Sequence, residues 1–480
     1  MREENYTLLC DYYELTMANG YYELGRGQEI TYFDVFFRTV PDGGGFAIFA
    51  GLEQIADYVR NLHFTDEDIA FLRGKGIFSE GFLSYLRGFH FTGDMYAIRE
   101  GTPIFPGEPI LTVRAPAIEA QIIETFVLLS VNLQSLIATK ANRIVRAAQG
   151  RAVAEFGSRR AQGAQGAILG ARAAYIGGCS STACTLSDRD YHIPASGTMA
   201  HSWVQMFDSE YEAFTAYCKL YPHNATLLVD TYNVLESGVP QAIRVFKEQG
   251  IARGGIRIDS GDIAYLSKKA RKMLDEAGLT ECKIVASNSL DEFIIRDLIS
   301  QGACIDAFGV GERLITAKSD PVFGCVYKLA AVEDREGNIH PKIKISENTE
   351  KITNPSYKKV YRIIDRKTGQ PIADYITMAD EVVDESQPLV LFDPVCTWKK
   401  KVVTDYIARP LHEQVFRGGA YVYPERDDIE TLRRYCAGEV DALWDEVKRF
   451  ENPHRYYVDL SEKLWNLKHR MLENEGKLAE

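Results

Sequence analysis

The chain has 480 residues, 46% hydrophobic and 25% charged, a composition typical of a soluble globular protein with more than one domain. The formal net charge of −12 argues against a general nucleic-acid or anionic-membrane surface, so any phosphate site has to be local. No uninterrupted run of about 18 apolar residues occurs, and MREENYTLLCDYY is acidic where a signal peptide is basic and then apolar, so we expect a cytoplasmic location.

Residues 1–118 predict an N-terminal α/β (α+β) domain. Helical segments such as 51–62 accompany short strands, which we expect at 31–37, 45–51, 93–100 and 109–116. Residues 119–149 have apolar positions at helical spacing and are followed by a glycine, so they predict a helix that links this domain to the next.

Residues 150–340 alternate strand and helix patterns and predict an irregular (β/α) barrel. Within them, β-branched, apolar stretches run directly into glycine, hydroxyl or charged residues at six places: 152–160, 193–202, 227–233, 254–262, 283–292 and 305–316. Chemistry in such a barrel gathers where the parallel strands end, so the pattern predicts an active site at one face. The C-terminal region, 341–480, contains a predicted hairpin at 360–378 and two helices.

Two of the strand ends have the character of phosphate-binding loops. Ser287 and Asn288 precede a predicted helix, and Gly309 and Gly311 follow an apolar strand. Backbone N–H groups at such positions bind phosphate oxygens. Tight turns are the alternative interpretation of the two glycines, and it stays open.

The segment RIDSGD (257–262) offers a ribose ligand. A carboxylate at the position of Asp259 can accept two hydroxyl hydrogen bonds and orient a substrate-bound Mg²⁺. Arg257 points to the same side of the strand, where an anion such as a carboxylate or phosphate is its expected partner. Asp262 opens the next helix, so helix capping is an equal alternative for it.

The segments EFGSRRAQG and GTMAHS contain three further candidates. Phe156 can stack on an aromatic ring and Arg159 can hold a carboxylate or diphosphate; a core phenylalanine with surface arginines is the alternative. His201 is either a hydrogen-bonded core histidine or a catalytic group.

Together these motifs, with LLVDTYN, SNSLDE and the N-terminal CDYYELTMANGYY, resemble nicotinate phosphoribosyltransferases as far as about residue 360. The resemblance implies transfer of the phosphoribosyl group from 5-phosphoribosyl 1-diphosphate to nicotinate, with Mg²⁺ and ATP hydrolysis. It also implies a C-terminal region that packs back on the N-terminal domain.

The resemblance assigns roles to particular residues. It implies that ATP phosphorylates His201, that Phe156 and Arg159 hold the pyridine, and that Thr198 helps to position it. Tyr13 would complete the ring sandwich from the other subunit of a homodimer. Asp230 is expected to fix the tautomer of His201.

Two positions depart from the family pattern. Glu312 replaces a hydroxyl residue found in some relatives, and we expect it to face away or to pair with Arg313. Ser180, or Ser181 after a one-residue slip, lies where nicotinamide-using relatives have an aspartate, and a serine there favours the anionic nicotinate; two loop serines that cap the next helix are the alternative. A nicotinamide phosphoribosyltransferase, a quinolinate enzyme of similar fold and a non-catalytic ribosyl-phosphate-binding barrel remain as alternative functions.

Overall fold

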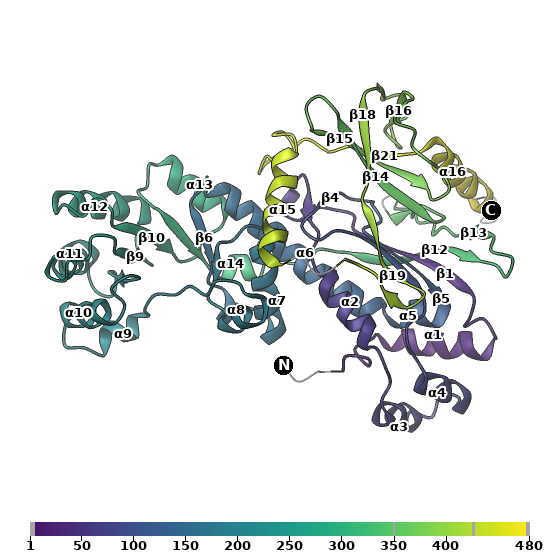
Figure 1. Cartoon of the computed structure of the whole chain (residues 1–480), viewed down its shortest axis with the longest axis horizontal. Coiled ribbons are helices and arrows are strands. Elements are labelled where there is room, and N and C mark those ends of the chain that lie inside the picture. Colours follow the sequence, from purple (N-terminus) through teal and green to yellow (C-terminus); the bar gives the residue numbers. More distant parts are fainter. Residues whose placement is uncertain (1–4, 349–350, 425–427, 477–480) are drawn as a thin grey trace. The chain divides into compact units, whose positions relative to one another are not determined.

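The computed structural model describes residues 5–348, 351–424 and 428–476, which form two compact units (Figure 1). The first unit takes the chain up to residue 136, residues 322–428 and the chain from 435. The second unit takes residues 137–321 and 429–434. The helix predicted to link the domains is present as α6 (Glu124–Ala147), and it runs through the division at 136.

The second unit is a parallel sheet with helices between its strands. Its strands are β6 (Ala152–Glu155), β7 (Ser181–Thr182), β8 (Thr226–Leu228), β9 (Gly255–Ile258), β10 (Lys283–Ser287) and β11 (Ala307–Val310). Its helices are η2 (Ser158–Arg160), α7 (Gly163–Ile176), α8 (Thr185–Tyr191), α9 (His201–Gln205), α10 (Glu210–Leu220), η3 (Val234–Gly238), α11 (Val239–Glu248), α12 (Ile263–Glu276), α13 (Glu292–Ser300) and α14 (Glu312–Ile315).

The strands of this sheet lie in the order β7-β6-β11-β10-β9-β8, and every pair is parallel. An isolated parallel bridge from Thr182 to Ala195 continues the β7 edge. Within the described ranges the pairing does not connect this edge to β8, so the α/β sheet is confirmed but the closed barrel is not. The segment 193–202, expected to be a strand, forms only that bridge and then enters α9.

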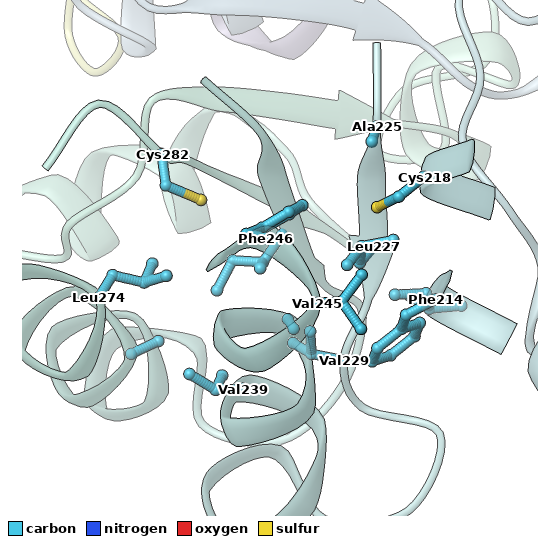
Figure 2. Close-up of a cluster of buried hydrophobic side chains, with 14 of the residues drawn as sticks. Phe214, Cys218, Ala225, Leu227, Val229, Val239, Val245, Phe246, Leu274 and Cys282 are labelled. Carbon is cyan, nitrogen blue, oxygen red and sulfur yellow. The ribbon is translucent and has the colours of Figure 1, made fainter. Parts of the chain in front are cut away.

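One face of this sheet packs on helices and forms a hydrophobic core (Figure 2). Because side chains alternate along a strand, Leu227, Val229 and Ile256 point to this face, where the side chains of α10, α11 and α12 bury them. Figure 2 shows Leu227 and Val229 beside Val245 of α11. Removal of this apolar surface from water contributes about 25 cal/mol per Å² to the stability of the unit. The opposite face is therefore free to carry polar residues.

The first unit contains four antiparallel or mixed sheets. Its strands are β1 (Ile30–Phe36), β2 (Ala47–Ile48), β3 (Asp94–Ile98), β4 (Pro103–Ile104), β5 (Leu111–Pro116), β12 (Val326–Glu333), β13 (Ile339–Pro341), β14 (Lys358–Asp365), β15 (Pro371–Met378), β16 (Leu389–Phe392), β17 (Lys400–Val403), β18 (Tyr406–Pro410), β19 (His412–Arg417), β20 (Ala420–Tyr421) and β21 (Val458–Leu460). Its helices are α1 (Tyr12–Glu23), η1 (Pro41–Gly43), α2 (Leu52–Asn61), α3 (Asp66–Gly74), α4 (Glu80–Arg87), α5 (Ala117–Ile122) and α16 (Glu462–Gly476), and α15 (Ile429–Ala442) lies partly in each unit.

The largest sheet of this unit joins strands from both ends of the chain. The seven-stranded sheet has the order β13-β12-β1-β5-β3-β19-β20, and the four-stranded sheet has the order β18-β14-β15-β21. The strands expected near the N-terminus are present as β1, β2, β3 and β5, and the expected hairpin is β14–β15. The C-terminal strands β18 to β21 thus belong to the same unit as the N-terminal strands.

Among the described residues, one helical segment, 117–147, is long and apolar enough to cross a membrane by length and composition, with a mean hydropathy of 1.6 over an 18-residue window. Polar residues such as Gln134 and Lys140 interrupt it, so it contains no continuous apolar run of about 18 residues. The protein itself buries 67% of this window. Its apolar character therefore fits a core helix.

Candidate active site

The polar face of the parallel sheet gathers candidates from four strands. Paired residues on parallel neighbours point to the same face, and the pairs Arg257–Val285, Ser287–Gly309, Gly309–Ala154 and Ala154–Ser181 define one continuous face. Asp259, two residues beyond Arg257, continues the same side. The strand ends therefore bring a carboxylate, a guanidinium, hydroxyls and a glycine to one edge.

Asp259 and Asp230 form the centre of this edge. Ser287 donates its hydroxyl hydrogen to Oδ1 of Asp259. Asp230 accepts from the backbone N–H of Asp259 (3.1 Å) and from the hydroxyl of Ser260 (2.6 Å), both through Oδ2. Its other oxygen, Oδ1, is buried and has no hydrogen-bond partner among the described residues, so it is available to a ligand.

His201 is the first residue of α9 and lies next to Asp259. Its Nε2 is 4.0 Å from Oδ2 of Asp259, and its Nδ1 is 3.2 Å from Oγ1 of Thr231. The side chain is 40% exposed. When Nδ1 carries the proton and donates to Thr231, Nε2 keeps its lone pair and can act as a nucleophile. Asp230, the predicted tautomer partner, bonds to the 259–260 turn instead, and the prediction was one residue out.

Arg257 and Thr198 are joined directly. Nη1 of Arg257 donates to the hydroxyl of Thr198 at 2.6 Å, so both predicted substrate-binding residues lie on one face of the site. Burial lowers the pKa of Arg257, although the charges of Asp259 and Asp230 oppose this shift. Its Nε is buried without a hydrogen-bond partner among the described residues. A buried donor of this kind indicates a place for an anionic ligand.

The backbone after β10 has an unusual shape. Asn288 and Ser289 have φ angles of 86° and 52°, which side-chain-bearing residues seldom adopt. Each such residue costs on the order of 1–3 kcal/mol, and strain of this size collects at functional loops. This supports the interpretation of Ser287 and Asn288 as part of an anion-binding loop.

Gly309 has a packing role that the sequence did not reveal. It lies inside β11, and a Cβ atom there would be 2.5 Å from Cδ2 of Phe156. The glycine therefore makes room for the Phe156 ring. Gly311, just beyond the strand, lies against the Phe156 backbone and precedes α14.

Phe156 and Arg159 follow β6 at the same edge. Phe156 is half-buried and its N–H donates to the carbonyl of Val310 at 2.8 Å, whereas Arg159 is exposed in η2. No sequence motif pointed to Glu155, whose buried carboxylate accepts from the hydroxyl of Thr182 (2.7 Å) and from the N–H of Gly157. Burial raises the pKa of Glu155. It holds the turn that presents Phe156.

Three family models match this chain. They are the N-terminal domain of nicotinate phosphoribosyltransferase (residues 8–132), the nicotinate phosphoribosyltransferase family (152–373) and the C-terminal domain (357–468). The nicotinate phosphoribosyltransferase of Bacillus subtilis (strain 168) is 46% identical over 482 residues, covering 100% of this chain and 98% of that protein. The chain belongs to the nicotinate phosphoribosyltransferase family.

Human relatives extend this comparison. The human nicotinate phosphoribosyltransferase sequence is 30% identical, covering 95% of each chain. The crystal structure of human nicotinic acid phosphoribosyltransferase aligns with a TM-score of 0.83 and 27% identity over 96% of this chain and 99% of that chain. A nicotinate-nucleotide pyrophosphorylase from Pyrococcus furiosus shares the fold, with a TM-score of 0.70 and 22% identity over 92% of this chain and 97% of that chain.

The structure gives the contacts of the two positions that depart from the family pattern. The hydroxyl of Ser180 donates to the carbonyl of Val153 at 3.1 Å, so it is occupied by the backbone; Ser181, paired with Ala154, is on the ligand face. Neither serine caps α8, which begins after Cys184. Glu312 pairs with Lys318 at 2.7 Å and not with Arg313.

Asp262 is the N-cap of α12, and its side chain accepts from the N–H of Tyr265 at 3.0 Å. The capping alternative is therefore confirmed for this residue. Asp259 alone of the two carboxylates in RIDSGD is placed beside His201.

Tyr13 lies in the first unit, on α1. It is 45% exposed, and its neighbours Leu9, Tyr12 and Met17 are exposed as well. Partial burial and the nearby Glu124 raise the pKa of Tyr13, so it stays a neutral phenol at physiological pH. An exposed aromatic and apolar group of this kind favours contact with another surface.

The first unit also contains a cationic cavity that the sequence did not reveal. Its volume is about 260 Å³, and one carboxylate, Asp34, lies among basic side chains: Arg38, Lys328, Lys358, Arg455 and Lys468. Burial and the Lys358 charge lower the pKa of Lys468 to about 8. These basic residues are far apart in sequence, so only the fold brings them together.

A metal site made of protein ligands alone is not found: within the described ranges, no three His, Cys, Asp or Glu side chains are grouped to hold one. The unpartnered Oδ1 of Asp230 and the half-exposed carboxylate of Asp259 are nevertheless hard oxygen ligands at one edge. They fit a Mg²⁺ ion that arrives with a phosphorylated substrate.

Proposed function

We propose that this chain transfers the 5-phosphoribosyl group from 5-phosphoribosyl 1-diphosphate to nicotinate, giving nicotinate mononucleotide and diphosphate with the assistance of ATP. The carrying observation is the assembly of Arg257, Asp259 and His201 at one edge of the parallel sheet. Family membership supports the choice of substrates. Such a product would serve the synthesis of NAD.

The transfer requires positioning and charge stabilisation. The ring nitrogen of nicotinate forms a bond to C1 of the ribose with its own lone pair, the C1–oxygen bond to diphosphate breaks, and diphosphate leaves with that electron pair. Asp259 accepts hydrogen bonds from the ribose hydroxyls, and its negative charge stabilises the developing oxocarbenium charge. No general base is needed.

Phe156 and Arg159 hold the pyridine in this proposal. Phe156 stacks on the ring, while the carboxylate of nicotinate pairs with Arg159 or with the buried guanidinium of Arg257, which Thr198 orients. Ser181, which takes the place proposed for Ser180, faces the carboxylate without repelling it. The backbone at Ser287, Asn288 and Gly311 binds phosphate oxygens.

ATP assistance proceeds through His201. Its Nε2 forms a bond to the γ-phosphorus of ATP, the bond to the bridging oxygen breaks, and ADP leaves; water later releases phosphate from the histidine. The Thr231 hydroxyl keeps the proton on Nδ1. Mg²⁺, held through substrate phosphates near Asp259 and Asp230, would neutralise phosphate charge when bound.

The site is proposed to be completed by a second copy of the chain. Tyr13 is 45% exposed on α1, and in a two-fold dimer it would close the pyridine sandwich. No nucleic acid or membrane is part of this proposal, and the enzyme is expected to work in the cytoplasm.

The product assay tests the proposal. Purified protein is incubated with 5-phosphoribosyl 1-diphosphate and either nicotinate or nicotinamide, with and without ATP and Mg²⁺, and mononucleotides are quantified by chromatography. We expect nicotinate mononucleotide, more of it with ATP. Preferred use of nicotinamide would establish the alternative enzyme, and binding without product would establish a ribosyl-phosphate-binding protein.

A further inference from the structure

A buried ion cluster lies at the start of α13, three residues after the strained backbone at Asn288 and Ser289. The carboxylate of Glu292, the first residue of α13, has Nζ of Lys140 at 2.8 Å and Nε of Arg143 at 2.8 Å. All three side chains are at most 3% exposed. The two basic residues come from α6, so the cluster ties the start of α13 to a long helix.

The same cluster reaches the neighbouring strand end. Lys140 also donates to the hydroxyl of Ser319, which lies just after α14, at 2.8 Å. Asp291 caps α13 by accepting from the N–H of Ile294 at 2.9 Å, and its second oxygen pairs with Arg313 of α14. Two separate polar links therefore join the loop after β10 to the segment after β11.

This arrangement holds the loop at both ends. Strand β10 fixes Ser287, the ion pair with Arg313 fixes Asp291 and the cluster fixes Glu292, while Asn288 and Ser289 keep positive φ angles. A strained backbone of this kind persists only where its surroundings determine it.

Stability alone does not account for three buried charges. Burial of ions carries a desolvation penalty, and apolar residues of similar volume often stabilise a core as well or better. Burial and the neighbouring Arg143 charge lower the pKa of Arg146, one turn further along α6, to about 10. A geometric role for the cluster explains its presence.

We infer that Glu292, Lys140 and Arg143 are positioning residues that set the spacing between the 287–289 loop and the Gly311 loop, so that both bind one phosphorylated substrate. This inference rests on the proposed function, because it names what holds the phosphate loops of that site. None of the three residues touches the reacting atoms.

The first test is the variant Glu292→Gln, which keeps the shape of the side chain and removes its charge. We expect KM for 5-phosphoribosyl 1-diphosphate to rise about tenfold or more, with kcat and the KM for nicotinate within about threefold of native. Asp275→Asn, which breaks an exposed ion pair with Arg271 on α12, is the matched control and should change none of these values. If Glu292→Gln folds and its KM for 5-phosphoribosyl 1-diphosphate is unchanged, the inference is contradicted.

The second test separates a positioning role from a stabilising role, and it can be carried out even if Glu292→Gln folds poorly. Replacement of all three residues by methionine removes the charges and restores an apolar core. A structural role predicts native kinetics in this variant, whereas positioning predicts that the raised KM persists. Glu292→Asp, which keeps the charge on a shorter side chain, should recover part of the native value.

Titration calorimetry with 5-phosphoribosyl 1-diphosphate alone distinguishes this inference from the proposed function. If native protein binds 5-phosphoribosyl 1-diphosphate but forms no product, the proposed function fails. The inference can still be tested, because the affinity for this compound can be measured without turnover. Equal affinity of the native and Glu292→Gln proteins would overturn the inference whatever the outcome of the product assay.

Discussion

The imidazole of His201 lies between Thr231 and Asp259, with Nδ1 3.2 Å from the hydroxyl of Thr231 and Nε2 4.0 Å from the carboxylate of Asp259. The proposed phosphoryl acceptor and the proposed ribose ligand are therefore neighbours. A phosphoryl group on Nε2 would place negative charge beside the carboxylate of Asp259. Phosphorylation of His201 and the binding of ribosyl phosphate at Asp259 can therefore influence each other through this direct electrostatic interaction.

The position of Ser181 predicts a change in pyridine preference. In Ser181→Asp, a carboxylate about 4 Å from that of nicotinate costs on the order of 4 kcal/mol at an effective dielectric near 20, about three decades in kcat/KM. Nicotinamide has no such charge. The measurement is kcat/KM for both pyridines. A shift of less than about tenfold in the ratio of the two values would show that Ser181 does not face the nicotinate carboxylate.

Ser180→Asp is the matched control for this prediction. Its side chain would meet the carbonyl of Val153, which now accepts a hydrogen bond from the serine. Two acceptors would then face each other, so the variant should lose stability while the preference between the pyridines stays the same.

The close approach of Gly309 to Phe156 predicts a defect in nicotinate binding. In Gly309→Ala the new methyl group would lie 2.5 Å from the ring, which has to move. We expect KM for nicotinate to rise about tenfold, and KM for 5-phosphoribosyl 1-diphosphate to rise less. Gly166→Ala in α7, whose nearest neighbour would be 3.8 Å away, is the control and should keep native kinetics. Equal behaviour of the two variants would contradict the packing role of Gly309.

The exposed Tyr13 predicts sites shared between subunits. Tyr13→Ala and Asp259→Ala should each be nearly inactive, because each alters every site of a homodimer. Refolding the two together in equal amounts should recover about a quarter of native activity, since half of the dimers would contain one unaltered site of two. Recovery is measured in the nicotinate assay. An inactive mixture would show that Tyr13 does not serve the partner's site.

The buried Glu14 of α1 predicts a fall in stability towards alkaline pH. Burial raises its pKa from 4.5 to about 8, although a hydrogen bond from Thr125 opposes this, and the charge of Glu124 adds to the shift. Between these values the folded protein retains a proton that the unfolded chain releases. The free energy of unfolding therefore falls as pH rises, by at most about 1.4 kcal/mol per pH unit.

Glu14→Gln should remove this part of the pH dependence. The measurement is the Tm of both proteins at pH 5 and pH 8, with Glu67→Gln on the exposed side of α3 as the control. If Tm falls by the same amount from pH 5 to pH 8 in the native protein and in Glu14→Gln, Glu14 is not the source of the pH dependence.

Local patterns were sufficient for much of the fold. The apolar runs that end in polar residues located β6, β9, β10 and β11, because buried parallel strands have this composition. They failed at 193–202, where a proline and several small residues precede His201: this segment contributes a single bridge and then a helix. Closure of a barrel depends on contacts between distant strands, which local patterns do not contain.

The candidate site shows the same limit. Residue type and position selected Asp259, Arg257 and His201 as candidates, but the choice between neighbouring residues required the strand register. Strand pairing decides for Ser181 over Ser180, and the turn after β9 engages Asp230, which leaves Thr231 for His201. Glu155 and the cationic cavity depend on residues far apart in the chain, so no short motif could reveal them.

Transfer of label from γ-labelled ATP to His201 tests the proposed mechanism most directly. Native protein should acquire an acid-labile phosphoryl group that peptide mapping places on His201, and Thr231→Val should acquire it more slowly because Nδ1 loses its hydrogen-bond partner. His201→Ala should take up no label and lose stimulation by ATP, while slow transfer to nicotinate remains. Equal acid-labile labelling of native and His201→Ala protein would contradict the account.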